Sequence, residues 1–371
     1  MKIGFNFLEA GNEPIKQALL QSCENKNGKD VLIFGFDPKR GRHIEYLPCT
    51  HSNTEKFRPG LRSWIYEDLF LPFAIAKSGI ELFFSPSMDL PYRQPCKTAV
   101  TVNDLNPLMF QDERPKGMEA SVKYKIRTSA VKKANRIITF SQHSKNLIRR
   151  LLGVEAGKIE VAPYPVQKEF TPVYSEQKIY EETGKRGISH PYFIYCGGAS
   201  ARENLKELLN IFYSFLHSKN EASLVIEGLD EKKAAEIKKA DTSGRLFFIN
   251  GLEPTEKCLL LNGACAFLSA SVHETTCEEA LQAMACGTPI IAYETEAFSQ
   301  ILAHSAVLLK RGDRMSFVKA MKDAKDHPNM RLQMRALGIQ HSKLFSAERF
   351  TAKLSEVFQN ILGERYRPDE K

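Results

Sequence analysis

Residues 273–291 read His-Glu-Thr-Thr-Cys-Glu-Glu-Ala-Leu-Gln-Ala-Met-Ala-Cys-Gly-Thr-Pro-Ile-Ile. The stretch places an acid, Glu274, just after an apolar run. Its pattern predicts a helix over 277–286 that ends at Gly287, followed by a strand at 290–293. A carboxylate at a strand end that faces a helix N-terminus is a place where a polar ligand with a phosphate can bind. The block therefore predicts a strand and helix alternation with a ligand site at a strand end.

The same alternation extends along almost the whole chain. Most expected strands are short apolar runs without period-two alternation, as is typical of buried parallel strands. In the first half we expect strands at 2–7, 31–36, 44–48, 81–86, 98–103, 136–141 and 159–163, and helices around 13–22, 62–77, 117–133 and 142–152. In the second half we expect strands at 192–196, 223–228, 246–250, 266–270, 289–293 and 306–309, and helices at 202–217, 231–239, 254–262, 277–286, 296–303, 313–325, 328–343 and 347–362.

The length of the chain favours two domains. A chain of 371 residues is too long for one ordinary core. The region 164–190 is rich in Pro, Gly and charge, and it predicts the connection between the domains. We therefore expect a first domain over 1–170 and a second over 171–346, each a doubly wound parallel sheet. Ligands bind beyond the carboxyl ends of such strands, so the expected site is a cleft between the domains.

The composition argues against several classes of protein. Hydrophobic residues make up 43% of the chain, and no window approaches eighteen consecutive apolar residues, so no membrane-spanning helix is expected. The N-terminal residues lack the apolar region of a signal peptide. The eight cysteines include no Cys-x-x-Cys pair, which favours a reduced, cytoplasmic protein without a zinc site.

The net charge of +8 is concentrated in one segment. Residues 121–150 contain nine basic residues and no acid, and Lys125, Lys132 and Arg136 are expected on one helical face. One interpretation is a surface that docks on anionic lipid headgroups at the membrane. The other is a solvated helix face, which is what most charge runs are. Both stay open, while nucleic acid is disfavoured because no aromatic residues interleave with the basic ones.

Glu274 and Gln282 are separated by seven residues, and Ala-Met-Ala-Cys-Gly-Thr-Pro follows at 283–289. This block resembles the paired-glutamate motif of the retaining family-four glycosyltransferases, also described as glycosyl transferases group 1. Further anchors stand in that family's order: Trp64-Ile-Tyr-Glu67 with Leu71-Pro72, Ser85-Pro86, Pro91, Thr101-Val-Asn-Asp-Leu105, Ala134-Asn-Arg-Ile-Ile-Thr-Phe-Ser141 with Ser144, and Tyr195-Cys-Gly-Gly198 with Arg202-Glu-Asn-Leu205.

The resemblance implies a fold and a co-substrate. The fold is α/β of the GT-B type, with two facing Rossmann-like doubly wound parallel-sheet domains and a cleft between them. The C-terminal helix, about 347–371, is expected to pack back on the first domain. The first domain is implied to bind the acceptor and the second a nucleotide-diphospho-sugar, with no other cofactor.

Four residues of the second domain are implied to face the donor. Gly197 and Gly198 follow a strand and precede a helix, and glycine permits the backbone to approach a diphosphate closely. Arg202 suits phosphate oxygens because a guanidinium can donate to two of them at once. By resemblance, Glu274 contacts hydroxyls of the donor sugar.

Two residues depart from the family pattern at this site, and Gln300 is a third departure. Gln282 stands where the family has the glutamate that grips both ribose hydroxyls, and a carboxamide accepts at one end but donates at the other. Glu203 stands at the usual lysine. An acid near a diphosphate is repelled by roughly 4 kcal/mol for unit charges 4 Å apart in an intermediate dielectric. Either Glu203 turns away, or the site does not hold a nucleotide sugar in the usual manner.

Other donor contacts are implied around these residues. Three residues replace the family's usual Gly-Phe-Gly and narrow or reshape the sugar pocket: Thr275, Thr276 and Cys277. Cys277 is either a reactive thiol at a helix N-terminus or an ordinary pocket residue, and we favour the second. His273 is placed at the site by the resemblance. Recognition of the base is expected through the backbone near Gly251 and Leu252.

The acceptor side is expected at Asn103 and Asp104, which end a strand and complete the catalytic group with Glu274. Many relatives have His-Asp at this point, and Asn103 cannot titrate, so it orients a hydroxyl rather than acting as a base. In the mechanism proposed for the family, the leaving phosphate takes the acceptor proton on the same face. The protein then positions the reactants and stabilises the diphosphate charge. No Asp-x-Asp occurs, and we predict metal independence.

The resemblance therefore implies a sugar transferase that retains anomeric configuration, with a glycan or lipid-linked acceptor, in cell-surface polysaccharide or glycoconjugate biosynthesis. Its expected location is the cytoplasm, including the inner face of the membrane. A degenerate GT-B protein that acts as a non-enzymatic partner subunit is the alternative. A GT-B epimerase or phosphorylase is weaker, because no pyridoxal-phosphate lysine is evident.

Overall fold

The protein divides into two compact units in a computed structural model that describes residues 2–7, 13–24, 31–37, 42–44, 68–69, 71–173 and 175–363. The first unit contains the described residues up to Pro165 and those from Ala347 onward, and the second is Val166–Ser346. The expected segments 45–48 and 62–67, the anchor at Trp64 and the end of the chain after 363 lie outside the described residues.

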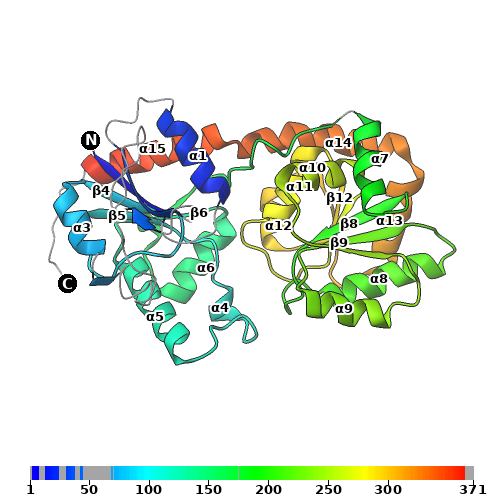
Figure 1. Cartoon of the computed structure of the whole chain (residues 1–371), viewed down its shortest axis with the longest axis horizontal. Helices are drawn as coiled ribbons and strands as arrows, with labels where there is room; N and C mark the ends of the chain where they lie inside the picture. The colour runs from blue at the N-terminus through cyan, green and yellow to red at the C-terminus, as the bar shows by residue number, and fades with distance from the viewer. Residues whose placement is uncertain are drawn as a thin grey trace. The chain divides into compact units, whose positions relative to one another are not determined.

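The first unit is built on a seven-stranded sheet in the order β3-β2-β1-β4-β5-β6-β7; Figure 1 labels three of these strands, β4, β5 and β6. All neighbours are parallel except β2 and β3. Every described residue of β4 and β5 is buried, which explains their apolar runs without alternation. The strands are β1 (Ile3–Phe7), β2 (Val31–Asp37), β3 (Arg42–Ile44), β4 (Leu82–Ser85), β5 (Lys97–Thr101), β6 (Arg136–Thr139) and β7 (Ile159–Val161). The helices are α1 (Glu13–Glu24), α3 (Leu71–Ser78), α4 (Asn106–Met109), α5 (Met118–Lys133) and α6 (Gln142–Leu152).

The last described helix, α15 (Ala347–Gly363), belongs to the first unit although it follows the second in sequence. It lies beside α1 in Figure 1. The ring of Phe358 packs on Phe84 of β4 with centroids 5.3 Å apart. The Lys97 Nζ donates to the carbonyl oxygen of Ile361 over 2.6 Å. The helix thus fills part of the first core and receives a charged cap on its last turn.

The second unit is built on a six-stranded, fully parallel sheet in the order β10-β9-β8-β11-β12-β13. Numbered within the unit this order is 3-2-1-4-5-6, so the winding reverses between β8 and β11. The strands are β8 (Tyr192–Cys196), β9 (Ser223–Glu227), β10 (Leu246–Ile249), β11 (Phe267–Ser269), β12 (Ile290–Tyr293) and β13 (Val307–Leu309). The helices are α7 (Glu176–Lys185), α8 (Leu205–His217), α9 (Glu231–Ala240), α10 (Pro254–Gly263), α11 (Glu278–Cys286), α12 (Glu296–Ile301), α13 (Arg314–Asp326) and α14 (Pro328–Ser342).

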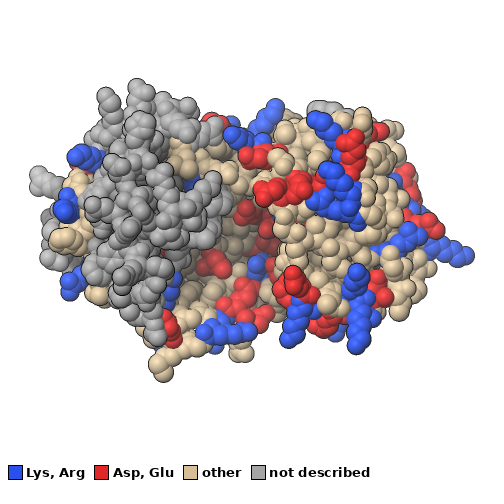
Figure 2. Space-filling view, in the orientation of Figure 1, with Lys and Arg blue, Asp and Glu red and all other residues tan. Residues whose placement is uncertain are grey.

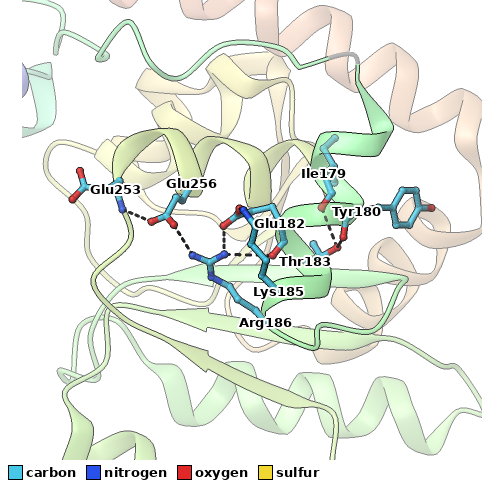
Figure 3. A network of polar contacts seen from close by, with 8 residues as sticks. All are labelled: Ile179, Tyr180, Glu182, Thr183, Lys185, Arg186, Glu253 and Glu256. Carbon is cyan, nitrogen blue, oxygen red and sulfur yellow. Dashed lines mark hydrogen bonds and ion pairs between the residues drawn. The ribbon is translucent and has the colours of Figure 1, made fainter.

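The region 164–190 is not only a connection, because it contains α7, and α7 packs on α10. Arg186 links the two helices by binding Glu182 of α7 and donating to the Glu256 carboxylate of α10 over 2.9 Å (Figure 3). Glu182 is only 4% exposed, so it needs these cations. Of the Gly and Pro residues that suggested a linker, Gly184 and Gly187 lie at the C-terminal end of α7.

The basic segment 121–150 spans α5, β6 and α6, so its charges do not share one helix face. Arg136 is the first residue of β6 and does not belong to a helix. The expectation that it shares one helical face with Lys125 and Lys132 is therefore wrong. The chain leaves the helix because Asn135 bonds to Thr98 through both its amide and its side chain, over 3.0 and 2.9 Å. Arg127 is 4% exposed and lies within 3.8 Å of the carboxylates of two acids, Asp68 and Asp89.

The described residues contain no helix with both the length and the apolar content needed to cross a bilayer. On the face of the second unit shown in Figure 2, acidic and basic side chains are interspersed. Residues 166–346 contain 22 basic and 22 acidic residues, so this mixed surface reflects a balanced charge.

Candidate functional site

The reversal point of the second sheet brings the two most informative loops together. Strands β8 and β11 are neighbours, with Ile194 paired to Phe267. The glycine loop follows β8, and the loop that carries Glu274 follows β11. The amide of Val272 donates to the Arg202 carbonyl oxygen over 2.7 Å, which ties the loops to each other. In open α/β sheets this is the place where ligands bind.

A cavity of about 60 Å³ lies between these loops. Its volume suits a few waters or one small polar group, and it is far smaller than a pocket for a whole nucleotide sugar. Five residues expected at the site line it: Gly197, Arg202, Glu203, Glu274 and Cys277. The other lining residues are Tyr195, Cys196, Phe267, Ser269, Ser271, Glu279, Ala280 and Phe298.

Glu203 points into the glycine loop rather than away from it. Its Oε1 accepts from the amide of Gly198 and its Oε2 from the amide of Ser200, each over 2.9 Å. A β-carbon at position 198 would lie 2.8 Å from Glu203 Oε2, so only glycine leaves room for the carboxylate. The sequence left open whether the Glu203 carboxylate turns away from the glycine loop. These two hydrogen bonds show that it does not.

Three carboxylates and one guanidinium share the cavity. The Arg202 guanidinium lies 3.6 Å from the Glu203 carboxylate. Glu279 and Glu274 contribute the other two acids. Burial raises the pKa of Glu274 to about 7, with Arg202 opposing the rise and Glu279 adding to it. A carboxyl group with this pKa exchanges its proton near neutral pH and both donates and accepts hydrogen bonds there.

Helix α11 begins at this cavity with an unusual backbone. Cys277 is its N-cap and has φ 55°, in the left-handed region that favours glycine. Its thiol is buried, and burial together with Glu274 and Glu279 raises its pKa well above the ordinary value. A thiol in this state is not a nucleophile at neutral pH. Cys277 therefore shapes the cavity wall.

Gln282 lies one turn further along α11 and presents an unused acceptor. Its side-chain nitrogen donates to the Glu278 carboxylate over 3.2 Å. Its Oε1 is buried and accepts no hydrogen bond from the part of the chain that the structure describes. The residue is only 6% exposed, and an unsatisfied buried acceptor costs about 1–3 kcal/mol. A ligand hydroxyl would satisfy it.

The remaining expected donor residues do not line the cavity. His273 is buried, and Thr275 and Thr276 are half-buried in the same loop. Gly251 has φ 69° and follows β10, with Leu252 half-buried after it. These two glycine-turn residues lie two strands away from β8 in the sheet order.

Asn103 and Asp104 belong to the first unit, where they follow β5. The Asp104 Oδ1 accepts from the amide of Asn106 over 2.7 Å and so shapes the turn. Burial and the charge of Asp104 raise the pKa of the Tyr124 phenol to about 12. The Tyr124 hydroxyl is itself buried without a described partner. This strand end thus offers amide, carboxylate and phenol groups.

The sequence indicated no site role for Tyr195, which stands there only as part of an anchor, or for Glu279. Tyr195 donates from its hydroxyl to the Gly198 carbonyl oxygen over 2.7 Å and so fixes the loop that Glu203 enters. A β-carbon at Gly197 would lie 2.7 Å from that hydroxyl, which explains the first glycine. Glu279 lies in the first turn of α11, where acids are common. Nothing in its sequence position marks it as a cavity residue.

Comparisons with known proteins agree with this architecture. The profile of the family described as glycosyl transferases group 1 matches residues 179–341. The O-antigen chain mannosyltransferase B of Escherichia coli is 18% identical over 283 residues, which are 75% of this chain and 74% of that protein. The structure of sucrose-phosphate synthase from Thermosynechococcus elongatus superposes with a TM-score of 0.73 at 17% identity, covering 97% of this chain and 99% of that chain.

A second solved structure is HepE of Anabaena in complex with UDP and glucose, with a TM-score of 0.71 at 12% identity. It covers 97% of this chain and 99% of that chain. At these identities the structural likenesses establish the fold. The fold is GT-B, and residues 179–341 of the second unit match the profile of the glycosyl transferases group 1.

Proposed function

We propose that the protein transfers a sugar from a nucleotide-diphospho-sugar to a glycan or lipid-linked acceptor, with retention of anomeric configuration. The observation that carries the proposal is the cavity at the sheet reversal, which Glu274, Arg202 and the glycine loop line. The mannosyltransferase likeness favours assembly of a cell-surface polysaccharide. The family match favours this function over a non-enzymatic partner subunit.

On the donor side, we assign Glu274 to the sugar hydroxyls. A carboxyl with pKa about 7 both donates to and accepts from hydroxyl groups near neutral pH. The Gln282 Oε1 is assigned to a ribose hydroxyl, because it is buried and lacks a donor among the described residues. Arg202 is the guanidinium of the cavity and is assigned to the diphosphate. The complex of HepE with UDP and glucose is consistent with a UDP-sugar as one candidate donor.

On the acceptor side, we assign Asn103 and Asp104 of the first unit. Neither residue acts as a base, because Asn103 does not titrate and the Asp104 carboxylate already accepts from the amide of Asn106. The leaving phosphate then takes the acceptor proton as the glycosidic bond forms. The protein positions the two substrates and stabilises the charge that develops on the diphosphate.

We further propose that the reaction needs no metal ion. Among the described residues, no three His, Cys, Asp or Glu side chains are grouped so that they share a metal. Arg202 supplies the positive charge at the cavity. The exposed basic side chains of segment 121–150 are proposed to dock on anionic lipid headgroups, which would place the protein at the inner face of the membrane; they are Lys125, Lys132, Lys133, Arg149 and Arg150.

The test is a nucleotide-release screen across UDP-, GDP- and dTDP-sugars with purified protein. The wild type is expected to release one nucleoside diphosphate, and Glu274→Ala to lower the rate about a hundredfold or more. Glu221→Ala is the matched control, since Glu221 is an exposed acid of the same unit, and its rate should equal the wild type. If the wild type neither releases nor binds any of these donors, the proposed function is wrong.

A further inference from the structure

The loop after β8 presents two backbone amides to one side chain of its own chain. The amides of Gly198 and Ser200 donate to the two oxygens of Glu203, each over 2.9 Å. The carboxylate is 13% exposed, so it sits within the loop rather than on its surface. Two convergent amides on two oxygens of one anion form the arrangement that binds phosphate oxygens in glycine-rich loops.

The loop is shaped to accept this carboxylate. A β-carbon on Gly198 would lie 2.8 Å from Glu203 Oε2 and 3.3 Å from Oε1. Tyr195 holds the Gly198 carbonyl oxygen from the other side over 2.7 Å. The amide of Glu203 also donates to the Ser200 carbonyl oxygen over 3.2 Å, which folds the chain back on itself. The anion position of the loop is therefore formed and filled without any ligand.

The two ends of the proposed donor site are in opposite states. At α11, the Gln282 Oε1 is buried with no described donor and is ready for a hydroxyl. At the glycine loop, both amides are already used, and the Arg202 guanidinium faces Glu203 at 3.6 Å. Two more acids, Glu274 and Glu279, line the same cavity. A diphosphate entering here meets donors that are engaged and a cation that is partly neutralised.

We propose that the Glu203 carboxylate is an internal competitor for the diphosphate of the donor, which it keeps off the amides of Gly198 and Ser200 until it is displaced. The inference rests on the proposed function. Displacement exchanges one anion for another on the same amides and frees Arg202 for the incoming phosphates. The same competition acts on the nucleoside diphosphate product, because the carboxylate returns as that product leaves. Glu203 is thus a positioning residue that sets affinity for the charged part of the donor.

The experiment measures binding of UDP, GDP and dTDP, and of the matching phosphate-free nucleosides, by titration calorimetry. Wild type, Glu203→Ala and Glu203→Gln are compared. Glu203→Ala frees both amides and is expected to bind the nucleoside diphosphate about tenfold more tightly. Glu203→Gln keeps one acceptor for the amides, and its affinity for the nucleoside diphosphate is expected to rise about threefold. Nucleoside affinity should not change in either variant, because a nucleoside does not reach the loop amides.

Glu279→Gln is the matched control for charge. It removes an acid from the same cavity but leaves both amides engaged, so its gain should fall well below that of Glu203→Ala. If Glu279→Gln and Glu203→Ala gain equally in affinity for the nucleoside diphosphate, the proposed competition for the amides is wrong. Charge repulsion alone would then explain both gains. Diphosphate binding that is unchanged or weaker in both Glu203 variants, while the wild type binds, would also overturn the competition. If Glu203→Ala does not fold, Glu203→Gln decides by the same criterion. If folded wild type and variants all fail to bind any nucleoside diphosphate, the proposed function itself fails.

Discussion

Replacing Glu274 by glutamine is expected to stabilise the second unit at pH 8 and to leave its stability unchanged at pH 4. The pKa of Glu274 is raised from 4.5 to about 7, first by burial and then by the neighbouring acids, with Arg202 opposing. A carboxyl whose pKa is higher in the folded state binds a proton on folding, so its contribution to stability falls as the pH rises from 4.5 to 7. The difference between about 7 and 4.5, at 1.36 kcal/mol per pH unit, amounts to about 3 kcal/mol.

The assay follows urea unfolding by hydrogen exchange of peptides from β8 and β11 between pH 4 and pH 8. Peptide-level exchange reports on the second unit even if the two units unfold separately. Glu274→Gln and wild type should agree at pH 4, where the carboxyl is protonated in both the folded and unfolded chain. As the pH rises, the free energy of unfolding of the variant should exceed that of the wild type by a growing margin. This margin should reach about 3 kcal/mol at about pH 7.

A companion variant tests the cause of the raised pKa. Glu279→Gln removes an acid that raises the pKa of Glu274. The pH range over which stability is lost should therefore lie at lower pH in this variant than in the wild type. Arg202→Met removes the opposing cation, and the range should move up. A difference between wild type and Glu274→Gln that does not depend on pH would refute the reasoning, as would a wild type that gains stability relative to the variant as the pH rises.

Three further predictions concern packing and backbone geometry. Arg186→Met should cost the second unit about 2 kcal/mol in urea unfolding, because the buried Glu182 loses a partner, whereas Lys185→Met, at a side chain 70% exposed, should cost less than about 0.5 kcal/mol. Cys277→Gly should be more stable than Cys277→Ala by about 1 kcal/mol in the same assay, since φ is 55° there; equal stabilities would show that the residue is unstrained. Phe358→Ala should cost the first unit about 3 kcal/mol by calorimetry, while Gln359→Ala on the exposed side of α15 should cost almost nothing, and similar losses would mean that α15 is not part of that core.

Much of the fold was predictable because its strands are buried on both faces. Such strands appear as short apolar runs, and β8 spans the residues that the sequence predicted, 192–196. Helix α7 was missed because the Gly and Pro residues around it outweighed its own pattern. Within it, only Ile179, Glu182 and Thr183 are buried, and two of these are polar residues that hydrophobicity alone does not mark.

The candidate site was predictable in its members but not in its contacts. Five expected residues line one cavity because each follows a strand at the reversal of the sheet. The direction of Glu203 was open, since its partners are backbone amides that converge only in the folded loop. Arg127 looked like part of a cationic surface, yet it is buried against acids that are distant in sequence. Side-chain identity does not reveal such non-local pairing.

The place of α15 has a consequence for how the chain reaches its native state on the ribosome. The second unit is continuous in sequence, so it can fold as soon as residue 346 is outside the exit tunnel. The first unit begins earlier but lacks a wall of its core until Phe350, Leu354, Val357, Phe358 and Ile361 have been made. Its apolar sheet face must wait, exposed, while the whole second unit is synthesised. The part of the protein that is translated first is therefore the part that finishes last and depends most on protection from aggregation during synthesis.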